Sequence, residues 1–295
     1  MTQKRILIYS LLSFLPVWGI TILYMLCGGK YESNGMNLIL TLSMICPVIA
    51  VIGTRLFTKE GFGSKENPVM LLGIDLSKGK WIWFLAAFLL PIFYSDLGIG
   101  LFYLLFPKSF DGSLPGLMKE LREVWWMFPI SGITNALVFS FGALGEEIGW
   151  RTYLYPKLEE LFGSTKAIIF GGIIWGVWHY PAIYMGHNFG RGYLGEPFSG
   201  FFVFTIFTIF VGACLHYITK KTKSVWAAAF FHASNNVFFG NTLLFMALSK
   251  ERVPKLVQES PVFLAIVFIP VCILGIVCMI CLNKEEKSLK NKGNL

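Results

Sequence analysis

Residues 128–151 read FPISGITNALVFSFGALGEEIGWR, an apolar stretch that ends in two adjacent carboxylates and an arginine. No charged residue interrupts the stretch before Glu146, and its length suits a helix that crosses a bilayer, which takes about 20 residues. Polar and apolar residues do not alternate along it as they would in a strand of a transmembrane barrel. The stretch therefore predicts a membrane-spanning helix with ionisable groups near one end.

Further apolar runs of similar length occur on both sides of this stretch, at residues 6–27, 37–57, 81–106, 166–185, 199–219, 225–248 and 261–282. Of the 295 residues, 55% are hydrophobic and 14% are charged, whereas soluble domains contain about 25% charged residues. This composition, with a mean hydropathy of +0.63, excludes most soluble enzymes, disordered chains and nucleic-acid-binding domains. We predict an all-α polytopic membrane protein, a bundle of about eight transmembrane helices with a polar intramembrane cavity.

Basic residues are distributed unevenly between the predicted loops. With eight spans, the segments on the side of the N-terminus contain roughly twice as many Lys and Arg residues as those on the opposite side. The bias predicts a multi-pass protein of the cell membrane with both termini in the cytoplasm. Contact with anionic lipid then explains the basic pI of about 9.1 without nucleic acid. We expect one membrane domain, residues 1–295, in which residues 283–295 form a disordered cytoplasmic tail.

Ionisable residues within the apolar runs are informative because each costs about 2.5–3.5 kcal/mol at mid-bilayer, so they tend to mark sites or pathways. Glu147 and Arg151 are four residues apart and can pair on one face of a helix, whereas Glu146 points elsewhere. This spacing predicts a structural ion pair and leaves Glu146 available for chemistry. The alternative is that the run ends here and that all three are charges at the cytoplasmic interface.

Two other polar groups interrupt apolar runs. His179 follows Trp175 by four residues and so shares its helical face, and Pro181 predicts a break in the helix just after the histidine. His232 and Asn236 also share a face, within a run rich in alanine and phenylalanine. The alternatives are that His179 is a packing residue and that His232 and Asn236 form hydrogen bonds that hold helices together.

Together these residues supply the kinds of side chain that a hydrolytic site needs. A glutamate can act as a general base on water, histidines can orient that water, bind a metal or donate to an oxyanion, and an asparagine amide is a neutral oxyanion donor. Gly-x-Ser-x-Gly and His-Glu-x-x-His motifs are both absent from the sequence. His187, in a glycine-rich outer loop, and His216 are weaker candidates that we expect to be incidental.

The depths of these residues do not coincide for straight helices. Glu146 would lie closer to the inner surface than His179 and His232 if each helix began at the start of its apolar run. Tilted helices, a helix that continues beyond the bilayer, or a water-filled cavity would reconcile the depths. We expect a cavity open to the cytoplasm, because hydrolysis needs water and the charges need solvation.

The three groups resemble the motifs of the CAAX protease and bacteriocin-processing family, also called the CPBP or Abi family. Its pattern is E-E-x-x-x-R, then an aromatic residue followed four positions later by histidine, then H-x-x-x-N or H-x-x-x-D, on successive membrane helices. This chain has Glu146, Glu147 and Arg151, then Trp175 and His179, then His232 and Asn236. The match covers about residues 130–240, and Trp175 stands where phenylalanine is commoner.

The resemblance implies an intramembrane endopeptidase, similar to the type II CAAX prenyl endopeptidases, that cleaves a membrane-associated protein or peptide near the membrane. It also implies that Glu146 and His179 activate water and that His232 and Asn236 stabilise the oxyanion. Glu147, Arg151 and Trp175 would support these residues. The family is usually described as metalloproteases, so Glu146, His179 and His232 could bind zinc, but a metal-free glutamate mechanism uses the same residues.

Two other functions fit the same sequence. The chain could be a non-catalytic bacteriocin-immunity factor or a membrane scaffold or regulator, roles with which members of this family are associated. It could also be a transporter in which the polar residues relay protons or ions, although no internal repeat supports this.

Overall fold

The computed structural model describes residues 1–63, 70–110, 127–244 and 252–291. Within these ranges each apolar run is helical and no β-strand is formed, which confirms the all-α class. The helices are α1 (Thr2–Leu26), α2 (Asn34–Ser43), α3 (Cys46–Phe57), α4 (Trp81–Leu105), α6 (Met127–Gly149), α7 (Tyr155–Phe162), α8 (Ser164–Trp178), α9 (Tyr180–Met185), α10 (Phe198–Thr222), α11 (Val225–Leu244), α12 (Lys255–Gln258), α13 (Val262–Val267) and α14 (Ile269–Asn291). A 3-10 turn, η1 (Pro107–Ser109), follows α4, and a π-helical turn, η2 (Trp150–Leu154), joins α6 to α7.

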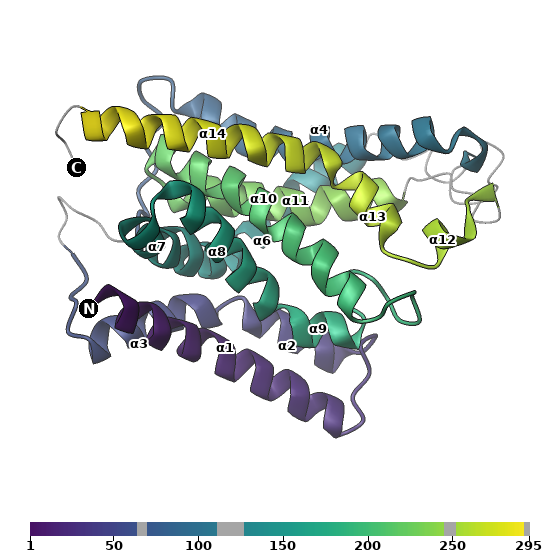
Figure 1. The fold of residues 1–295 in the computed structure, drawn as a ribbon, viewed down its shortest axis with the longest axis horizontal. Helices are drawn as coiled ribbons and strands as arrows, with labels where there is room; N and C mark the ends of the chain where they lie inside the picture. Colours follow the sequence, from purple (N-terminus) through teal and green to yellow (C-terminus); the bar gives the residue numbers. More distant parts are fainter. Residues whose placement is uncertain (64–69, 111–126, 245–251, 292–295) are drawn as a thin grey trace.

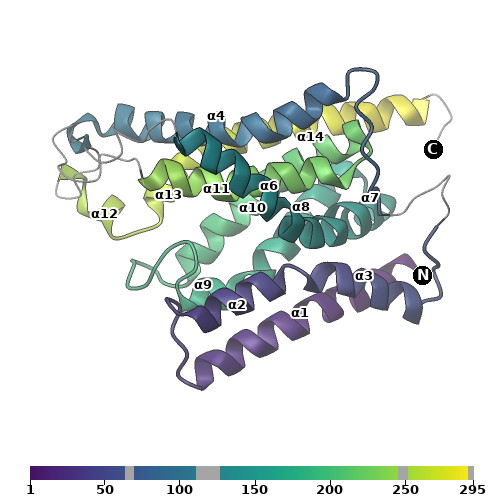
Figure 2. The same ribbon diagram turned by 180° about the vertical axis from the view of Figure 1, so that it is seen from behind.

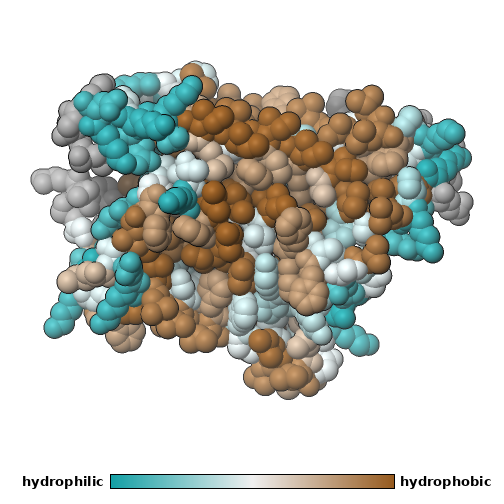
Figure 3. Space-filling model, viewed as in Figure 1, coloured by the Kyte–Doolittle hydropathy of each residue, from teal (hydrophilic) through white to brown (hydrophobic). Residues whose placement is uncertain are grey.

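Four helical segments of the described chain are long and apolar enough to cross a membrane: Thr2–Leu26, Asn34–Phe57, Trp81–Leu105 and Phe198–Thr222. The second of these consists of α2 and α3, which are separated by a break before Pro47. Hydrophobic residues cover the middle of the face shown in Figure 3, and hydrophilic residues gather toward its two ends. These features confirm a polytopic membrane protein, whereas the number of eight spans stays a prediction from the apolar runs.

The helices form a bundle with α1, α2 and α3 along one side and α4 and α14 along the other (Figures 1 and 2). Between them, α11 packs against α6 and α4, and α10 packs against α8 and α14. The beginning of α1 and the end of α14 lie at the same end of the bundle (Figure 1). An even number of membrane-spanning helices would place both ends of the chain on the same side of a membrane.

Helix α6 passes very close to α3 and to the break before it through two glycines. A Cβ atom at Gly145 would lie 2.6 Å from the carbonyl oxygen of Met44, and one at Gly149 would lie 2.4 Å from Cβ of Pro47. Small residues four apart allow membrane helices to approach closely. The two glycines flank Glu146 and Glu147, so this contact places both carboxylates inside the bundle.

The alternative that these residues are charges at the cytoplasmic interface required the helix to end at the carboxylates. The helical backbone does not end there. It continues from α6 through η2 and α7 to Phe162, and the side chains of Glu146, Glu147 and Arg151 are buried. Glu146 therefore lies well before the end of a long helical segment. A helix that continues in this way is one of the arrangements that would reconcile the difference in depth.

The C-terminal segment also differs from expectation. Residues 283–295 were expected to be a disordered tail, but α14 continues to Asn291. Glu286 accepts a hydrogen bond from the backbone N–H of Ser164 at 2.8 Å and one from Lys290 at 2.6 Å, and Glu285 pairs with Lys221. Ion pairs along the helix and contacts to α8 and α10 thus stabilise helical turns that are polar in sequence.

Glu60, just after α3, contacts residues of α1, η2 and α7. It accepts hydrogen bonds from Lys157 Nζ at 2.5 Å and Tyr153 Oη at 2.9 Å, and it lies 3.5 Å from Arg5 Nε. Burial alone would raise the pKa of the Glu60 carboxyl, but the bonds from Lys157 and Tyr153 and the charges of Lys157 and Arg55 outweigh burial and lower it.

Because the pKa of Glu60 is lower in the folded than in the unfolded chain, its stabilisation is complete above the unfolded value of about 4.3. This stabilisation is lost as the pH falls through the lower pKa that Glu60 has in the folded chain. Wild-type protein is therefore expected to lose more thermal stability than Glu60→Gln between about pH 5 and pH 3. Unfolding in detergent at both pH values measures this, and equal losses in the two proteins would contradict it.

Candidate active site

A cavity of about 700 Å³ inside the bundle collects most of the predicted site residues. Glu146 from α6, Trp175 from α8, His179 from the junction of α8 and α9, and His232 and Asn236 from α11 all line it. Glu147 and Arg151 do not line the cavity and are buried beside it. The three motifs, which are separated in sequence, therefore converge on one space.

The buried carboxylate of Glu146 is held by two tryptophans. The indole N–H groups of Trp150 and Trp175 both donate to Oε2, at 3.3 Å and 3.0 Å. No other hydrogen bond to Glu146 is formed by the described residues, so its second oxygen, Oε1, keeps its lone pairs for a group in the cavity. The spacing of Trp175 and His179 predicts a shared helical face, and the structure adds this direct hydrogen bond from Trp175 to Glu146.

Glu147 connects Arg151 to His232. Its Oε2 accepts a hydrogen bond from Arg151 Nε at 2.8 Å, so the ion pair predicted from the i,i+4 spacing is present. Its Oε1 lies 2.8 Å from His232 Nδ1, where the carboxylate accepts the ring N–H. The guanidinium of Arg151 is also 4.3 Å and 4.8 Å from the ring centres of Tyr155 and Trp175. Glu147 thus orients His232 and leaves its Nε2 for the cavity.

His179 is oriented by the backbone. Its Nδ1 lies 3.0 Å from the carbonyl oxygen of Trp175, and a carbonyl can only accept, so Nδ1 carries the proton. In the neutral imidazole Nε2 is then an acceptor directed to a second partner. The break between α8 and α9, predicted from Pro181, falls at His179 itself.

Asn236 lies beside a second asparagine, Asn235, which was not predicted to belong to the site. Asn235 Nδ2 donates to Asn236 Oδ1 at 3.0 Å, and the hydroxyl of Tyr94 on α4 donates to Asn235 Oδ1. Because the Oδ1 of Asn236 is occupied, its amide N–H groups are the part available to a ligand. The i,i+4 spacing from His232 singles out Asn236 in the sequence, whereas the contact of Asn235 with Tyr94 depends on how α4 and α11 pack.

His187 also lines the cavity, although its loop position suggested an incidental role. Its ring is parallel to that of His179 with 6.4 Å between centroids, and its Nδ1 is 2.8 Å from the hydroxyl of Tyr31. Burial lowers the pKa of His187 to about 4, so the ring is neutral near pH 7. Pro181 and Gly186, which begin and end the short helix α9, were the available signal that the chain turns back here.

The other weak candidate, His216, lies outside the cavity. It is buried on α10 with its Nε2 3.2 Å from Glu159 Oε1. The cavity itself extends toward Tyr31 and His187, in the loops at the end of the bundle opposite the start of α1 (Figure 1). A cavity open to the cytoplasm stays a prediction, while buried side chains of η2 and α7 pack into the core at the end of the bundle where α1 begins.

Zinc binding by Glu146, His179 and His232 stays a prediction. Among the described residues, no three His, Cys, Asp or Glu side chains are placed to hold one ion. Glu146, His179 and His232 line the same cavity, and Glu147 or a backbone carbonyl bonds to Nδ1 of each histidine. The Nε2 atoms of the two histidines and Oε1 of Glu146 are therefore the atoms that would hold a metal, which would polarise a bound water.

The fold and the site together define the class of protein: an α-helical membrane protein with a buried cavity whose glutamate, histidine and asparagine side chains suit hydrolysis. Residues 117–238 match the family model described as type II CAAX prenyl endopeptidase Rce1-like. The CAAX prenyl protease 2 of Methanococcus maripaludis is 28% identical over 88 residues, which are 30% of this chain and 32% of that protein. The match thus spans about a third of the curated relative's length. Both findings confirm the similarity to the CAAX protease family over the central part of the chain.

Proposed function

We propose that this protein is an intramembrane endopeptidase that hydrolyses a membrane-associated protein or peptide. The observation that carries the proposal is the convergence of Glu146, His179, His232 and Asn236 on one cavity. The similarity to CAAX proteases over residues 117–238 supports the same reaction class. The relative's name refers to prenylated substrates, and for this chain we propose the broader class of membrane-associated peptides.

In the proposed reaction, Glu146 is the general base. Its carboxylate takes a proton from water while the water oxygen bonds to the carbonyl carbon of the scissile peptide. His179 accepts the second O–H of that water through Nε2. Glu146 then returns the proton to the amide nitrogen as the carbon–nitrogen bond breaks, which yields one new carboxyl group and one new amine.

His232 and Asn236 stabilise the oxyanion that forms on the carbonyl oxygen. Asn236 donates from its amide, and His232 donates from Nε2 in its protonated form, whose positive charge is stabilised by the carboxylate of Glu147. Arg151 keeps Glu147 ionised and in place. We further propose that the protein lies in the cell membrane with cytoplasmic termini.

The test compares cells that lack this protein and are complemented with wild type, Glu146→Gln or Glu160→Gln at matched levels. Glu160 is exposed, so it provides the same substitution outside the cavity. The N-termini of membrane proteins and the released peptides are measured by mass spectrometry. We expect fragments that appear with wild type and Glu160→Gln but are absent with Glu146→Gln.

Identical peptide profiles for wild type and Glu146→Gln, with the cellular phenotype rescued by both, would contradict the proposal. That result would favour the non-catalytic immunity or scaffold function, which does not need the carboxylate.

A further inference from the structure

His187 lines the cavity of the candidate active site and takes no part in the proposed reaction. Its ring is partly buried and lies 6.4 Å, between centroids, from the ring of His179, and the two ring planes are 5° from parallel. Its Nδ1 is 2.8 Å from the hydroxyl of Tyr31, and the described residues form no hydrogen bond with its Nε2. This second ring nitrogen is therefore available to a ligand in the cavity.

The hydrogen bond to Tyr31 determines which kind of group His187 presents. A phenol hydroxyl is more acidic than a neutral imidazole N–H and is the stronger donor, so Tyr31 donates to Nδ1. In a neutral ring the proton then resides on Nε2, which is a donor. His179 has the opposite arrangement, because the carbonyl of Trp175 requires the proton on Nδ1 and leaves Nε2 as an acceptor. The two parallel rings thus offer one acceptor and one donor to the same cavity.

Short-range contacts fix the position of His187. Its backbone N–H donates to the carbonyl of Ala182 at 3.0 Å, and Gly186, with a φ of +119°, allows the chain to turn directly before it. The ring of Tyr31 packs against a cluster of buried side chains from α2 and α9, namely Met36, Ala182 and Met185. Both partners of the hydrogen bond are therefore held in place before a ligand arrives, which lowers the entropic cost of binding.

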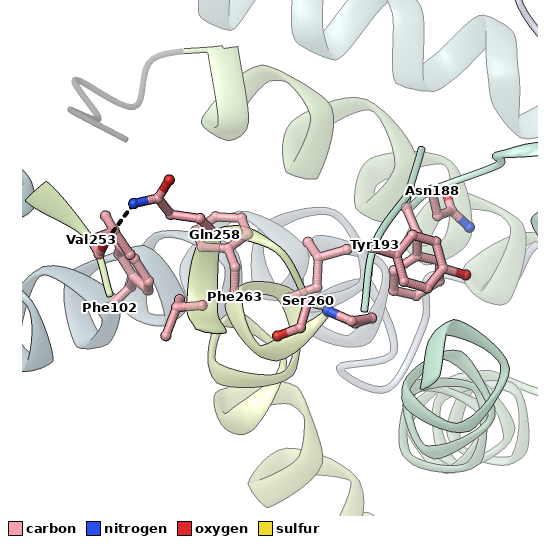
Figure 4. A pocket seen from close by; sticks show the side chains of 11 residues that line it. Phe102, Asn188, Tyr193, Val253, Gln258, Ser260 and Phe263 are labelled. Atoms are coloured by element: carbon pink, nitrogen blue, oxygen red, sulfur yellow. Dashed lines mark hydrogen bonds between the residues drawn. The ribbon is translucent and has the colours of Figure 1, made fainter. Parts of the chain in front are cut away.

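The loop that carries His187 is also attached farther along the chain. Asn188, the next residue, and Tyr193 line a second pocket of about 310 Å³ (Figure 4). Just beyond them, the N–H of Leu194 donates to the carbonyl of Glu259 at 2.5 Å, which joins the loop to the residue after α12. The protein itself thus holds both ends of this loop.

The spacing of the two histidine rings suits an extended peptide. Such a chain advances about 3.3 Å per residue, so the 6.4 Å between the ring centroids corresponds to about two residues. In the proposed reaction His179 holds the attacking water at the scissile bond, so the peptide would pass His187 about two residues from that bond. A donor needs an acceptor, and the backbone carbonyl is the acceptor that every residue of a peptide offers. Successive carbonyls of an extended chain point to opposite sides, so one of two neighbours faces Nε2.

We propose that His187 is a substrate-binding residue whose Nε2–H donates a hydrogen bond to a backbone carbonyl of the peptide, about two residues from the bond that is cleaved. Tyr31 is a positioning residue that acts through His187 by keeping the proton on Nε2. The inference rests on the proposed endopeptidase function and adds to it a contact that binds the peptide through its backbone.

The test uses purified protein in detergent micelles and a synthetic peptide that wild type cleaves. The peptide is selected from a pool in which an apolar anchor of about 20 residues precedes a randomised segment. The variants are His187→Gln, His187→Asn and Tyr31→Phe. The amide nitrogen of glutamine can take the place of Nε2, whereas that of asparagine reaches only as far as Nδ1. Tyr184→Phe is the matched control for Tyr31→Phe, because Tyr184 is exposed on α9 and does not line the cavity.

We expect His187→Asn to raise KM about tenfold, the change that follows from one lost hydrogen bond, while kcat stays within about twofold of wild type. His187→Gln should keep a KM near that of wild type, because it retains a donor at the position of Nε2. Tyr31→Phe should raise KM about threefold, because the ring remains but its tautomer is no longer fixed. Tyr184→Phe should match wild type, and all four variants should keep the wild-type melting temperature.

Peptides with a single thioamide locate the carbonyl that is bound. Sulfur accepts a hydrogen bond more weakly than oxygen, so a thioamide about two residues from the cut should raise KM for wild type. The same peptide should give no increase for His187→Asn, which has already lost the donor. A purely steric effect of sulfur would instead raise KM for both proteins and would contradict the contact.

A wild-type KM in His187→Asn would overturn the proposal. A fall in kcat at wild-type KM would overturn it in favour of a chemical role, and equal losses in His187→Asn and His187→Gln with a lower melting temperature would overturn it in favour of a structural one. In these cases the endopeptidase function stands as long as Glu146→Gln fails to cleave the peptide. If Glu146→Gln cleaves it at the wild-type rate, the endopeptidase function itself is wrong, and the role of His187 with it.

Discussion

Purified protein with Glu146→Gln is expected to hydrolyse peptide about 10²–10⁴-fold more slowly than wild type, the range that a general base contributes. Glutamine keeps an oxygen that can accept the indole hydrogen bonds of Trp150 and Trp175, so the surrounding structure should persist. It cannot take a proton from water, so only the chemical step is lost. The measurement is kcat on a cleaved peptide, together with the melting temperature.

Glu160→Gln is the matched control, because it makes the same change at an exposed position. It should keep wild-type kcat and stability. A Glu146→Gln protein that retains wild-type kcat would show that this carboxylate is not the base. A large fall in its melting temperature would instead assign Glu146 a structural role.

Arg151→Met is expected to cause the largest loss of stability, about 3–5 kcal/mol, which is typical when one partner of a buried ion pair is removed. Arg151 and Glu147 are both buried and joined by a 2.8 Å hydrogen bond. Without the guanidinium, the Glu147 carboxylate still accepts the hydrogen bond from His232. It no longer has a permanently positive partner. Methionine fills a similar volume, so the loss comes mainly from the unpaired charge and not from a cavity.

The double variant Glu147→Gln with Arg151→Met separates charge from packing. It removes both charges and keeps an amide oxygen that can accept from His232 Nδ1, so it should regain much of the stability that the single variant loses. Unfolding free energies of the four proteins of this cycle, measured in detergent, give the coupling between the two residues. Additive losses would mean that the ion pair contributes nothing to the fold.

The helices could be predicted from sequence because their causes are local or depend on composition. Long apolar runs must satisfy their backbone hydrogen bonds internally in a membrane, and helices do so within one segment. The polar end of α14 was not predicted, since ion pairs from Glu285 and Glu286 to Lys221 and Lys290 stabilise it. The continuation of α6 through the π-helical turn was missed because the apolar pattern ends at Glu146 and η2 has no hydropathy signal.

The candidate site was predicted as a set of residues, and its internal connections were not. The pair of Glu147 and Arg151 depends only on helical spacing, so it could be read from sequence. His187 could not, because its place beside His179 depends on how the chain turns after α9 and on Tyr31, 156 residues earlier. Their roles in catalysis stay predictions until the variants are measured.

The amino-acid sequence was enough to predict the class of protein, the helical runs, the break at His179 and the pairing of Glu147 with Arg151, because each follows from hydropathy or from neighbours within one or two turns. The packed structure was needed to show that Trp175 donates to Glu146, that Glu147 orients His232, and that His187 lines the same cavity. These features join residues from different helices, 29 and 85 positions apart in the two hydrogen bonds. Packing of whole helices places such residues together, and no local pattern encodes it.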